Sequence, residues 1–277
     1  MKVEKPPKGR RFESCSAHHV MVVSKVQKEV QKWWDETSAS YQRDSNISTH
    51  SAHYGPFSPD ENELKLLGNV GGKKILEIGC GGGQCSIAFA KQGAMCTGVD
   101  ISKEQLEYAE ELAKKNRVSV KFVQGDIQTL KQFKSSDYDI VFSAFALHYI
   151  PDLGKCFKEI YRVLGKKGIV ILGLSHPFYD VISPKTMKIS RSYNKAGKIT
   201  STETWPDGSK HKFVEFLHKI SEITDGLIDS GFVLEKVMEP LKLKGHVEWS
   251  VGGWEEIYPR KLVKLIGPTI IFKARKP

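Results

Sequence analysis

A run of glycines is the first feature of the chain that suggests a ligand site. The sequence ILEI at residues 75–78 predicts a buried strand, and GCGGG follows directly at residues 79–83. Glycines allow a sharp turn and leave bare backbone for a ligand, while the N–H groups that open the next helix suit a carboxylate or a phosphate. A GxGxxG dinucleotide loop would need glycine at position 84, where the chain has Gln84. The run therefore predicts a ligand-binding turn and disfavours a nicotinamide-dependent dehydrogenase.

Two carboxylates follow the next two predicted strands. Asp100 ends the second strand, 17 residues after Gly83, and its carboxylate can accept both hydroxyls of a ribose. Asp126 follows the third strand and can accept an exocyclic amine such as that of adenine. The alternatives are an N-cap for Asp100, a role that Ser102 fits better, and a plain Gly-Asp turn for Asp126. Because ligands of open α/β sheets bind beyond the carboxyl ends of the strands, the three strand ends together predict a site for an adenine nucleoside.

Strands and helices alternate around these residues, which predicts an α/β fold with a parallel, doubly wound sheet. The chain has predicted helices before this region and returns to helix and strand after it. The expected strands are residues 74–78, 95–100, 119–124, 138–142, 168–174, 232–244 and 269–274, and the expected helices are residues 23–41, 61–67, 84–92, 103–116, 153–163 and 212–230.

The composition is that of a globular protein with a basic surface. The chain has 277 residues, of which 40% are hydrophobic, and 42 Lys and Arg against 32 Asp and Glu give a formal net charge of +10. Such an excess suits a solvated face or the attraction of an acidic substrate, nucleic acid or anionic lipid. No apolar run reaches the length of a membrane span. Five cysteines without CxxC spacing indicate reduced thiols, and with no visible signal peptide they predict a cytoplasmic protein.

Three segments of the chain differ in character from the predicted sheet. Residues 1–20 lack apolar periodicity and are expected to be disordered, or a mis-annotated extension before a true start at Met21. Residues 21–68 are expected to form an N-terminal helical cap, and residues 69–277 the main domain. Within it, residues 178–212 are rich in Ser, Lys and Thr and are expected to form a lid insertion.

Residues 70–175 resemble a class I S-adenosylmethionine-dependent methyltransferase of the small-molecule, ubiquinone- or menaquinone-methylase-like kind. The matching sequences are LEIGCGGG at residues 76–83, VDIS at 99–102, QGD at 124–126, YDIV at 138–141 with ALHY at 146–149, and RVLGKKG at 162–168. The resemblance implies a Rossmann-like doubly wound sheet, mostly parallel with an antiparallel last strand and helices on both faces. It also implies S-adenosyl-L-methionine as the cofactor.

The resemblance further implies roles for individual residues. The glycines would pass under the methionine part of the cofactor, Asp100 would hold the ribose, and Asp126 would bracket the adenine. A Trp-Asp…Tyr segment before the domain caps the cofactor in many relatives, and Trp34-Asp35 with Tyr41 matches it; the alternative for Tyr41 is a core aromatic. The predicted cofactor residues are Tyr41, Glu77, Gly79, Gly81, Gly83, Asp100, Ile101, Asp126, Ile127 and Ser143.

A catalytic base is needed only if the methyl acceptor carries a proton, because methyl transfer is an in-line displacement that depends mainly on positioning and desolvation. The predicted catalytic residues are His148 after the fourth strand, and His176 and Tyr179 beyond the fifth. The alternatives are packing on the cofactor rim for His148, a capped turn for His176 and pocket lining for Tyr179. The histidines fit no zinc pattern, so no metal site is expected.

Two classes of acceptor remain open at this stage. The leading hypothesis is a small molecule held by aromatic residues of the variable parts: Tyr54, Phe57, Phe178, Tyr179, Trp205, Trp249 and Trp254. The alternative is RNA or tRNA, which the net charge favours and the lack of an RNA-binding module or of an Asn/Asp-Pro-Pro-Tyr/Phe motif after the fourth strand disfavours. A non-enzymatic binding subunit is a third interpretation, which the intact glycine turn and carboxylates disfavour. The sequence specifies neither the acceptor nor the oligomeric state.

Overall fold

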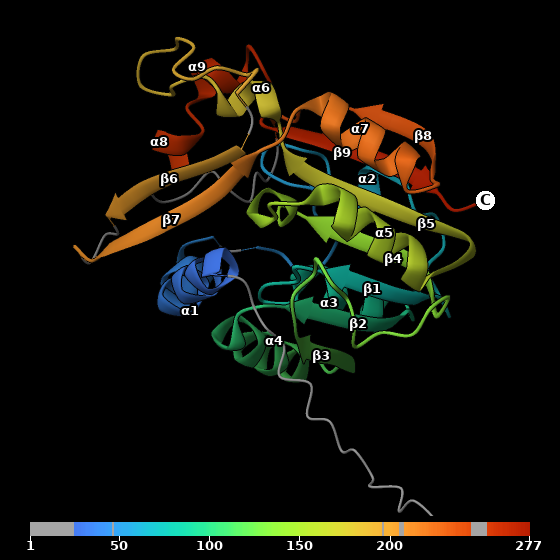
Figure 1. The fold of residues 1–277 in the computed structure, drawn as a ribbon. Coiled ribbons are helices and arrows are strands. Elements are labelled where there is room, and N and C mark those ends of the chain that lie inside the picture. Colours follow the sequence, from blue (N-terminus) through green and yellow to red (C-terminus); the bar gives the residue numbers. More distant parts are fainter. Residues whose placement is uncertain (1–24, 46, 196, 205–207, 245–253) are drawn as a thin grey trace, which may run out of the picture.

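A seven-stranded sheet forms the centre of the chain (Figure 1). The computed structural model describes residues 25–45, 47–195, 197–204, 208–244 and 254–277. The order of strands in the sheet is β3-β2-β1-β4-β5-β9-β8, and β6 and β7 form a separate hairpin. The strands are β1 (Lys74–Ile78), β2 (Met95–Asp100), β3 (Val120–Gln124), β4 (Tyr138–Ala144), β5 (Leu164–Ser175), β6 (Gly197–Thr204), β7 (Lys210–Leu217), β8 (Val233–Met238) and β9 (Thr269–Arg275).

The directions of the strands confirm the predicted fold class. Strands β1 to β5 pair in parallel, and β9 runs antiparallel between β5 and β8. The order reverses between β1 and β4, so the carboxyl ends of β1, β2 and β4 open a crevice at the switch point, where ligands of such sheets bind. The helices are α1 (Lys25–Ser45), α2 (Glu61–Leu64), α3 (Gln84–Lys91), α4 (Lys103–Lys115), η1 (Leu147–Tyr149), α5 (Leu153–Val163), α6 (Pro177–Asp180), α7 (Ile220–Asp229), α8 (Trp254–Ile257) and α9 (Arg260–Val263).

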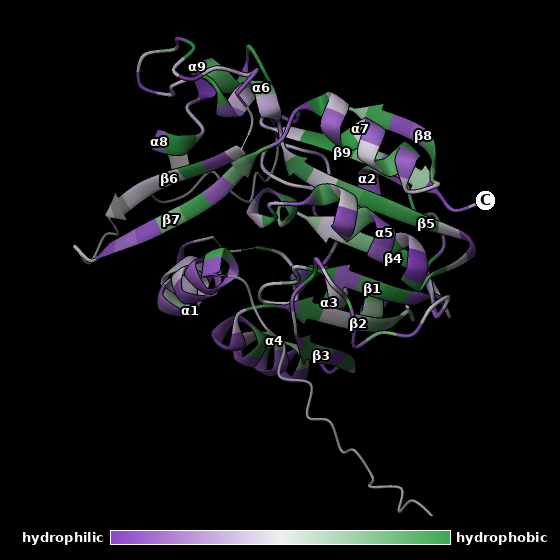
Figure 2. Cartoon of the chain, viewed as in Figure 1, coloured by the Kyte–Doolittle hydropathy of each residue, from purple (hydrophilic) through white to green (hydrophobic). Residues whose placement is uncertain are grey.

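Hydrophobic clusters cover both faces of the sheet, and its central strands are largely hydrophobic in sequence (Figure 2). Strand β1 is buried on both sides: Ile75 belongs to one cluster, and Leu76 belongs to the other. The cluster of Leu76 includes residues of α5 and α7, and the cluster of Ile75 includes residues of α3. Helices therefore lie on both faces, which explains why the parallel strands read as continuous apolar runs.

Side chains at the helix starts fix where the chain leaves the strand ends. The Ser102 hydroxyl accepts a hydrogen bond from Gln105 N at 3.2 Å, and Asp152 accepts one from Lys155 N at 2.9 Å. Ser102 is therefore the N-cap of α4, as predicted, which leaves Asp100 available to the crevice.

The prediction of a helix over residues 212–230 is wrong in its first part. Strand β7 occupies Lys210–Leu217, and α7 begins only at Ile220. Residues 210–217 have the two-residue alternation of a strand, with Val214 and Phe216 buried, and β6 supplies the pairing partner. The segment predicted as a lid thus begins with α6 and continues into the β6–β7 hairpin; its action as a lid stays a prediction.

Some expectations fall outside the described residues. The interpretations of residues 1–20, of Trp205 and of Trp249 are among them, and so is the side chain of Trp254. Within the described part of the chain, no helix is long and apolar enough to cross a membrane.

Candidate active site

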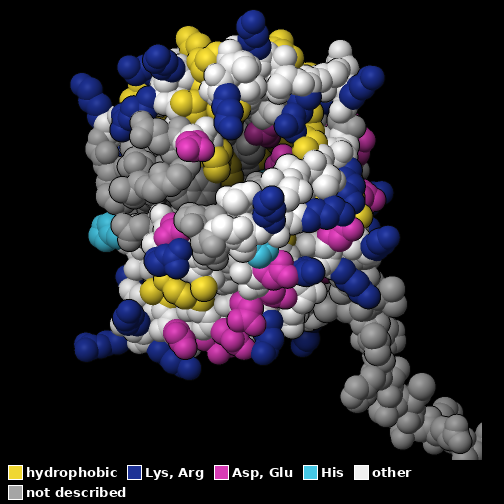
Figure 3. Space-filling view, turned by 90° about the vertical axis from the view of Figure 1, so that its left-hand side faces the viewer, with side chains coloured by type: hydrophobic (Ala, Val, Ile, Leu, Met, Phe, Trp, Pro, Cys, Tyr) yellow, Lys and Arg dark blue, Asp and Glu magenta, His cyan; other side chains and the backbone are white. Residues whose placement is uncertain are grey.

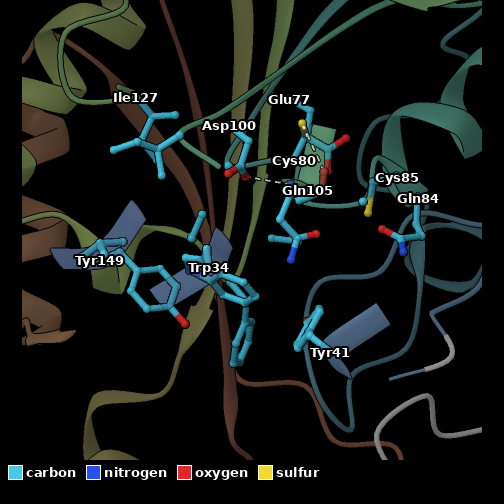
Figure 4. Close-up of a pocket in the computed structure, with 18 of the residues that line it drawn as sticks. Trp34, Tyr41, Glu77, Cys80, Gln84, Cys85, Asp100, Gln105, Ile127 and Tyr149 are labelled. Carbon is cyan, nitrogen blue, oxygen red and sulfur yellow. Dashed lines mark hydrogen bonds between the residues drawn. The ribbon is translucent and has the colours of Figure 1, made fainter. Parts of the chain in front are cut away.

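One cavity brings the ends of β1, β2 and β4 together beneath α1. It spans about 900 Å³ when the solvent at its open mouth is included. Strand ends and the loops after them contribute one side, and α1 contributes Trp34, Tyr41 and Gln42 on the other (Figure 4). A crevice at the switch point of the sheet therefore becomes an enclosed pocket because α1 covers it.

The glycine turn shapes the floor of this cavity. Gly79 has φ of +67°, and a Cβ on it would lie 2.1 Å from the Ala146 Cβ, so only glycine lets the loop after β4 approach this closely. Gly83 has φ of +74° and caps α3, and a Cβ there would lie 2.7 Å from the Phe122 ring. Gly79 and Gly81 line the cavity, whereas Gly83 supports the turn from behind.

Asp100 links the tip of β2 to the glycine turn. Its Oδ2 accepts a hydrogen bond from Gly81 N at 2.8 Å, and its Oδ1 accepts one from Ser102 N at 2.9 Å (Figure 4). The residue is only 8% exposed, and burial raises the pKa of its carboxyl even though the backbone N–H groups oppose this shift. Each oxygen keeps a second lone pair, so the carboxylate can still accept from ligand hydroxyls.

A second buried carboxylate, that of Glu77, lies beneath the turn. Its Oε2 accepts hydrogen bonds from Ser86 N at 2.7 Å and Ser86 Oγ at 2.5 Å. Burial raises the pKa of Glu77 to about 7. With Asp100 and Asp126, it makes a cavity lined by three carboxylates and, among the described residues, by no lysine or arginine. The cavity therefore favours a cationic ligand, although the chain as a whole carries a net charge of +10.

Three glutamines tie α1 to the turn, and the sequence reasoning missed them. Gln84 Nε2 donates to Gln42 Oε1 at 2.6 Å, and Gln42 Nε2 donates to Gln105 Oε1 at 2.7 Å. Gln105 is 1% exposed and lines the cavity, and within the described structure its Nε2 has no hydrogen-bond partner. A buried donor without a partner is costly, so a ligand oxygen at this position would remove the cost. No local pattern points to this set, because its members are 42 and 63 residues apart.

An aromatic wall closes the cavity on the side of α1. The Trp34 ring packs edge-on against Tyr41, with centroids 5.0 Å apart, and against Tyr149, with centroids 5.6 Å apart. All three residues line the cavity and come from α1 and η1. Tyr41, predicted as a cap or a core aromatic, thus faces the space beside the glycine turn (Figure 4).

The structure brings most of the predicted cofactor residues to this one cavity. Ser143 and Gly83 are the exceptions, and the Ser143 hydroxyl donates to Ile78 O at 3.0 Å and is fully buried. The predicted residues that line the cavity are Tyr41, Glu77, Gly79, Gly81, Asp100, Ile101, Asp126 and Ile127.

The three predicted catalytic residues do not line this cavity. The His148 ring lies against that of Tyr149, with centroids 4.1 Å apart, and burial lowers its pKa to about 3. His176 caps α6: its Nδ1 accepts from Phe178 N at 3.1 Å, and its Nε2 lies 2.8 Å from Glu239. The Tyr179 hydroxyl donates to Ile257 O at 2.9 Å. His148 can therefore act on the cavity through the two rings beside it that line the cavity, Tyr149 and Phe145.

A different histidine, His53, does line the cavity. It lies in the loop between α1 and α2. It lines the same cavity as Ala144, the last residue of β4, and Phe145. Burial lowers the pKa of its ring to about 4, so the imidazole is neutral at pH 7. The sequence offers no signal that separates His53 from His50, which is exposed. Among the described residues, no group of His, Cys, Asp or Glu could hold a metal ion.

Comparisons with known proteins agree with this geometry. A family model described as a methyltransferase domain matches residues 76–172. A protein of Geobacillus sp. (strain WCH70) that bears the name of a methyltransferase is 31% identical over 44% of this chain and 53% of its own length. A ubiquinone biosynthesis O-methyltransferase of Psychrobacter arcticus is 27% identical over 54% of this chain and 61% of its own length. The chain thus spans a little over half the length of these two relatives.

A solved structure shares the fold over nearly the whole chain. It is the geranyl diphosphate C-methyltransferase of Streptomyces coelicolor A3(2), in complex with Mg²⁺, geranyl diphosphate and S-adenosyl-L-homocysteine. It is 16% identical, its TM-score is 0.63, and the match covers 92% of this chain and 99% of the other.

The chain thus carries a methyltransferase domain over residues 76–172 and has the fold of a methyltransferase. The resemblance implies S-adenosylmethionine as the cofactor, and the cavity fits that molecule on observations of its own. The bare turn at Gly79 and Gly81 leaves room for a ligand, the Gln105 amide offers an unused donor, and the carboxylates suit a sulfonium cation. In this methyltransferase, Asp100 and Asp126 are the residues that would hold the ribose and the adenine.

Replacing Asp100 tests this assignment. Asp100→Ala removes a charged acceptor and also frees Gly81 N, so we expect the dissociation constant for S-adenosylmethionine, measured by calorimetry, to rise at least about tenfold. Asp225→Ala changes an exposed carboxylate on α7 and is the matched control. Equal affinity of the Asp100 variant and the wild type would refute the assignment.

The raised pKa of Glu77 predicts a pH dependence of cofactor binding. The cationic cofactor binds better when Glu77 is ionised, so its affinity should fall by up to about tenfold between pH 8 and pH 6. The same shift means that the ligand-free fold holds this proton more tightly than the unfolded chain does. The contribution of this bound proton to the free energy of unfolding is therefore lost as the pH rises through about 7.

Titration calorimetry over this pH range measures the effect. In Glu77→Gln the dependence should flatten, because the variant has no proton to lose at this position. S-adenosyl-L-homocysteine, which lacks the sulfonium charge, should show a smaller dependence than S-adenosylmethionine. An unaltered pH profile in Glu77→Gln would contradict the role given to this carboxylate.

Proposed function

We propose that the enzyme methylates a small, largely apolar molecule by in-line displacement at the sulfonium. The supporting observation is a single cavity in which the cofactor residues of the strand ends face an aromatic and aliphatic wall. That wall includes Trp34, Tyr149 and Ile150, together with Val30 of α1. A flat apolar acceptor fits such a wall better than a charged one does.

The roof of the cavity also favours a small acceptor. Val30 of α1 packs with Val214 and Phe216 of β7, and the Trp33 ring lies 4.9 Å from that of Phe213. The hairpin thus packs against α1, the helix that covers the cavity (Figure 1). One relative is, by its name, an O-methyltransferase of ubiquinone biosynthesis.

The negative charge of the cavity walls disfavours a nucleic acid as the acceptor. The walls carry the carboxylates of Glu77, Asp100 and Asp126, and the basic residues lie elsewhere. Bringing a phosphate backbone against these carboxylates would place like charges together in a poorly solvated space. The net charge of +10 therefore supports a partner other than the acceptor.

Bound S-adenosylmethionine supplies an activated methyl group, and the protein supplies the geometry and a dry environment. Trp34 and Tyr149 would hold the acceptor plane. We propose that His53 accepts the proton if the acceptor is a hydroxyl, since its imidazole is neutral and reaches the cavity. His148 would act as a positioning residue behind Tyr149. His176 and Tyr179 do not line the cavity. Any effect of theirs on catalysis would be indirect, through the elements that they stabilise.

The acceptor class is tested by transfer of a labelled methyl group into fractionated cell extract. We expect most of the label in the fraction of small molecules that organic solvent extracts. Label recovered chiefly in RNA would overturn the small-molecule proposal and favour the alternative of an RNA or tRNA acceptor. Boiled enzyme and Asp100→Ala are the controls.

The acceptor fraction found in this way allows the histidines to be compared. If His53 takes a proton from the acceptor, His53→Ala should lower kcat by about 10²-fold or more while the cofactor dissociation constant changes little. His148→Ala should lower turnover more than cofactor affinity, but less than His53→Ala does. The exposed His50 gives the matched control, His50→Ala. Wild-type kcat in His53→Ala would assign the proton transfer to solvent or to another group.

A further inference from the structure

Three segments outside the cavity form a surface that is both basic and apolar. They are residues 181–195, 241–244 and 257–266, here called the basic apolar surface. Together they contain nine Lys and Arg and no Asp or Glu. The chain as a whole has 42 and 32 of these residues, so the separation of charge here is pronounced.

These segments lie side by side because they share one hydrophobic base. Ile182, Leu243 and Ile266 all pack against the cluster that contains Leu262 and Val263 of α9. The Arg260 guanidinium also donates to Leu243 O at 3.2 Å, and Ile182 pairs with Ile189 in an isolated β-bridge. Figure 1 shows the loop after α6 beside α9 at one end of the molecule.

Large apolar side chains point outward from this base. Leu265 and Ile189 are each 77% exposed, the highest values among the large hydrophobic residues described. Five of the ten exposed large hydrophobic residues of the described chain belong to the surface: Met187, Ile189, Leu241, Ile257 and Leu265. Figure 3 shows hydrophobic side chains among lysines and arginines at the top of one face. Scattered apolar residues need no explanation, but a cluster within a ring of cations indicates a binding surface.

We propose that the basic apolar surface docks on a bilayer that contains anionic lipid. Aliphatic side chains enter the boundary between headgroups and acyl chains, while lysines beside them attract anionic headgroups. Lys185, Lys188, Lys261 and Lys264 are exposed and stand next to the apolar residues in the chain. Single-stranded nucleic acid is the alternative partner of a basic surface, but it is held by exposed aromatic rings. The exposed large hydrophobic residues of the three segments are Met, Ile and Leu, and the exposed ring beside them, that of Phe178, is already stacked on Tyr193.

This inference is independent of the acceptor, because it depends only on the charge, exposure and packing of the three segments. It is compatible with the proposed function, since an apolar acceptor dissolves in a bilayer. Docking would use side chains on loops and short helices at the surface and requires no membrane-spanning element.

The test is co-sedimentation of the full chain with vesicles. We expect binding to vesicles of equal parts phosphatidylcholine and phosphatidylglycerol, weakened by salt, and little binding to phosphatidylcholine alone. Lys188→Gln with Lys264→Gln should weaken the partition coefficient about thirtyfold, and Ile189→Asn with Leu265→Asn should weaken it by at least about tenfold. All four side chains are exposed, and circular dichroism checks that the variants fold.

Matched variants on other faces separate docking from general charge or stickiness. Lys114→Gln with Lys115→Gln removes two exposed lysines of α4, and Ile228→Asn removes an exposed isoleucine of α7. Both should bind vesicles like the wild type. Equal binding to both vesicle types, or wild-type binding by Ile189→Asn with Leu265→Asn, would overturn the proposal. So would binding of bulk tRNA that the lysine variant loses and the apolar variant keeps.

Discussion

The backbone hydrogen bonds that join the tips of β1 and β2 are the constraint on which the site depends. Gly79 N and Cys80 N both donate to Val99 O, at 2.8 and 3.1 Å, and Gly81 N donates to the Asp100 carboxylate. The glycine turn is therefore held by the neighbouring strand, and the carboxylate is held by the turn. Because these groups are buried, leaving any one of them without its partner costs free energy, so the turn has one stable shape. The ligand meets a surface that is already formed, which is the condition for binding without a large ordering cost.

The electrostatic character of the cavity follows from the same arrangement and differs from that of the protein surface. Glu77 lies near the end of β1, Asp100 ends β2 and Asp126 follows β3, and the sheet must bring these strands together, so their charges gather where solvent is scarce. Burial raises the pKa values of Asp100 and Glu77, which shows that both charges are destabilised without a cation. A sulfonium ligand offsets this cost, and its neutral product after methyl transfer does not. On this ground we expect the pocket to bind the substrate form of the cofactor more tightly than the product form.

The features of the fold and of the site that the sequence could predict are those set by local sequence patterns. The apolar run before GCGGG and the spacing to Asp100 predict the strand ends, because parallel strands of this length have few alternative arrangements. Residues 210–217 were misread since a short, half-buried hairpin strand rich in Lys and His resembles one face of a helix. The contact of Gln42 with Gln105 joins residues 63 positions apart and leaves no local trace. His176 is a helix cap whose sequence context, with Pro177 next to it, suits a pocket residue equally well.

Helix α1, which completes the site, is held in place by different interactions from those that hold the strands. Only two of its seven buried residues, Val30 and Trp33, are hydrophobic. Its other ties are polar: Asp35 accepts from Ser102 Oγ at 2.7 Å, and Glu29 pairs with Lys198 and Lys212 of the hairpin at 3.0 Å each. Exposed ion pairs contribute little and are screened by salt, so the buried hydrogen bonds of Gln42 with Gln84 and Gln105 are the main polar ties of α1 to the site. Helix α1 has no backbone ladder to the sheet, unlike the central strands, so we expect exchange of cofactor and product to pass beneath α1.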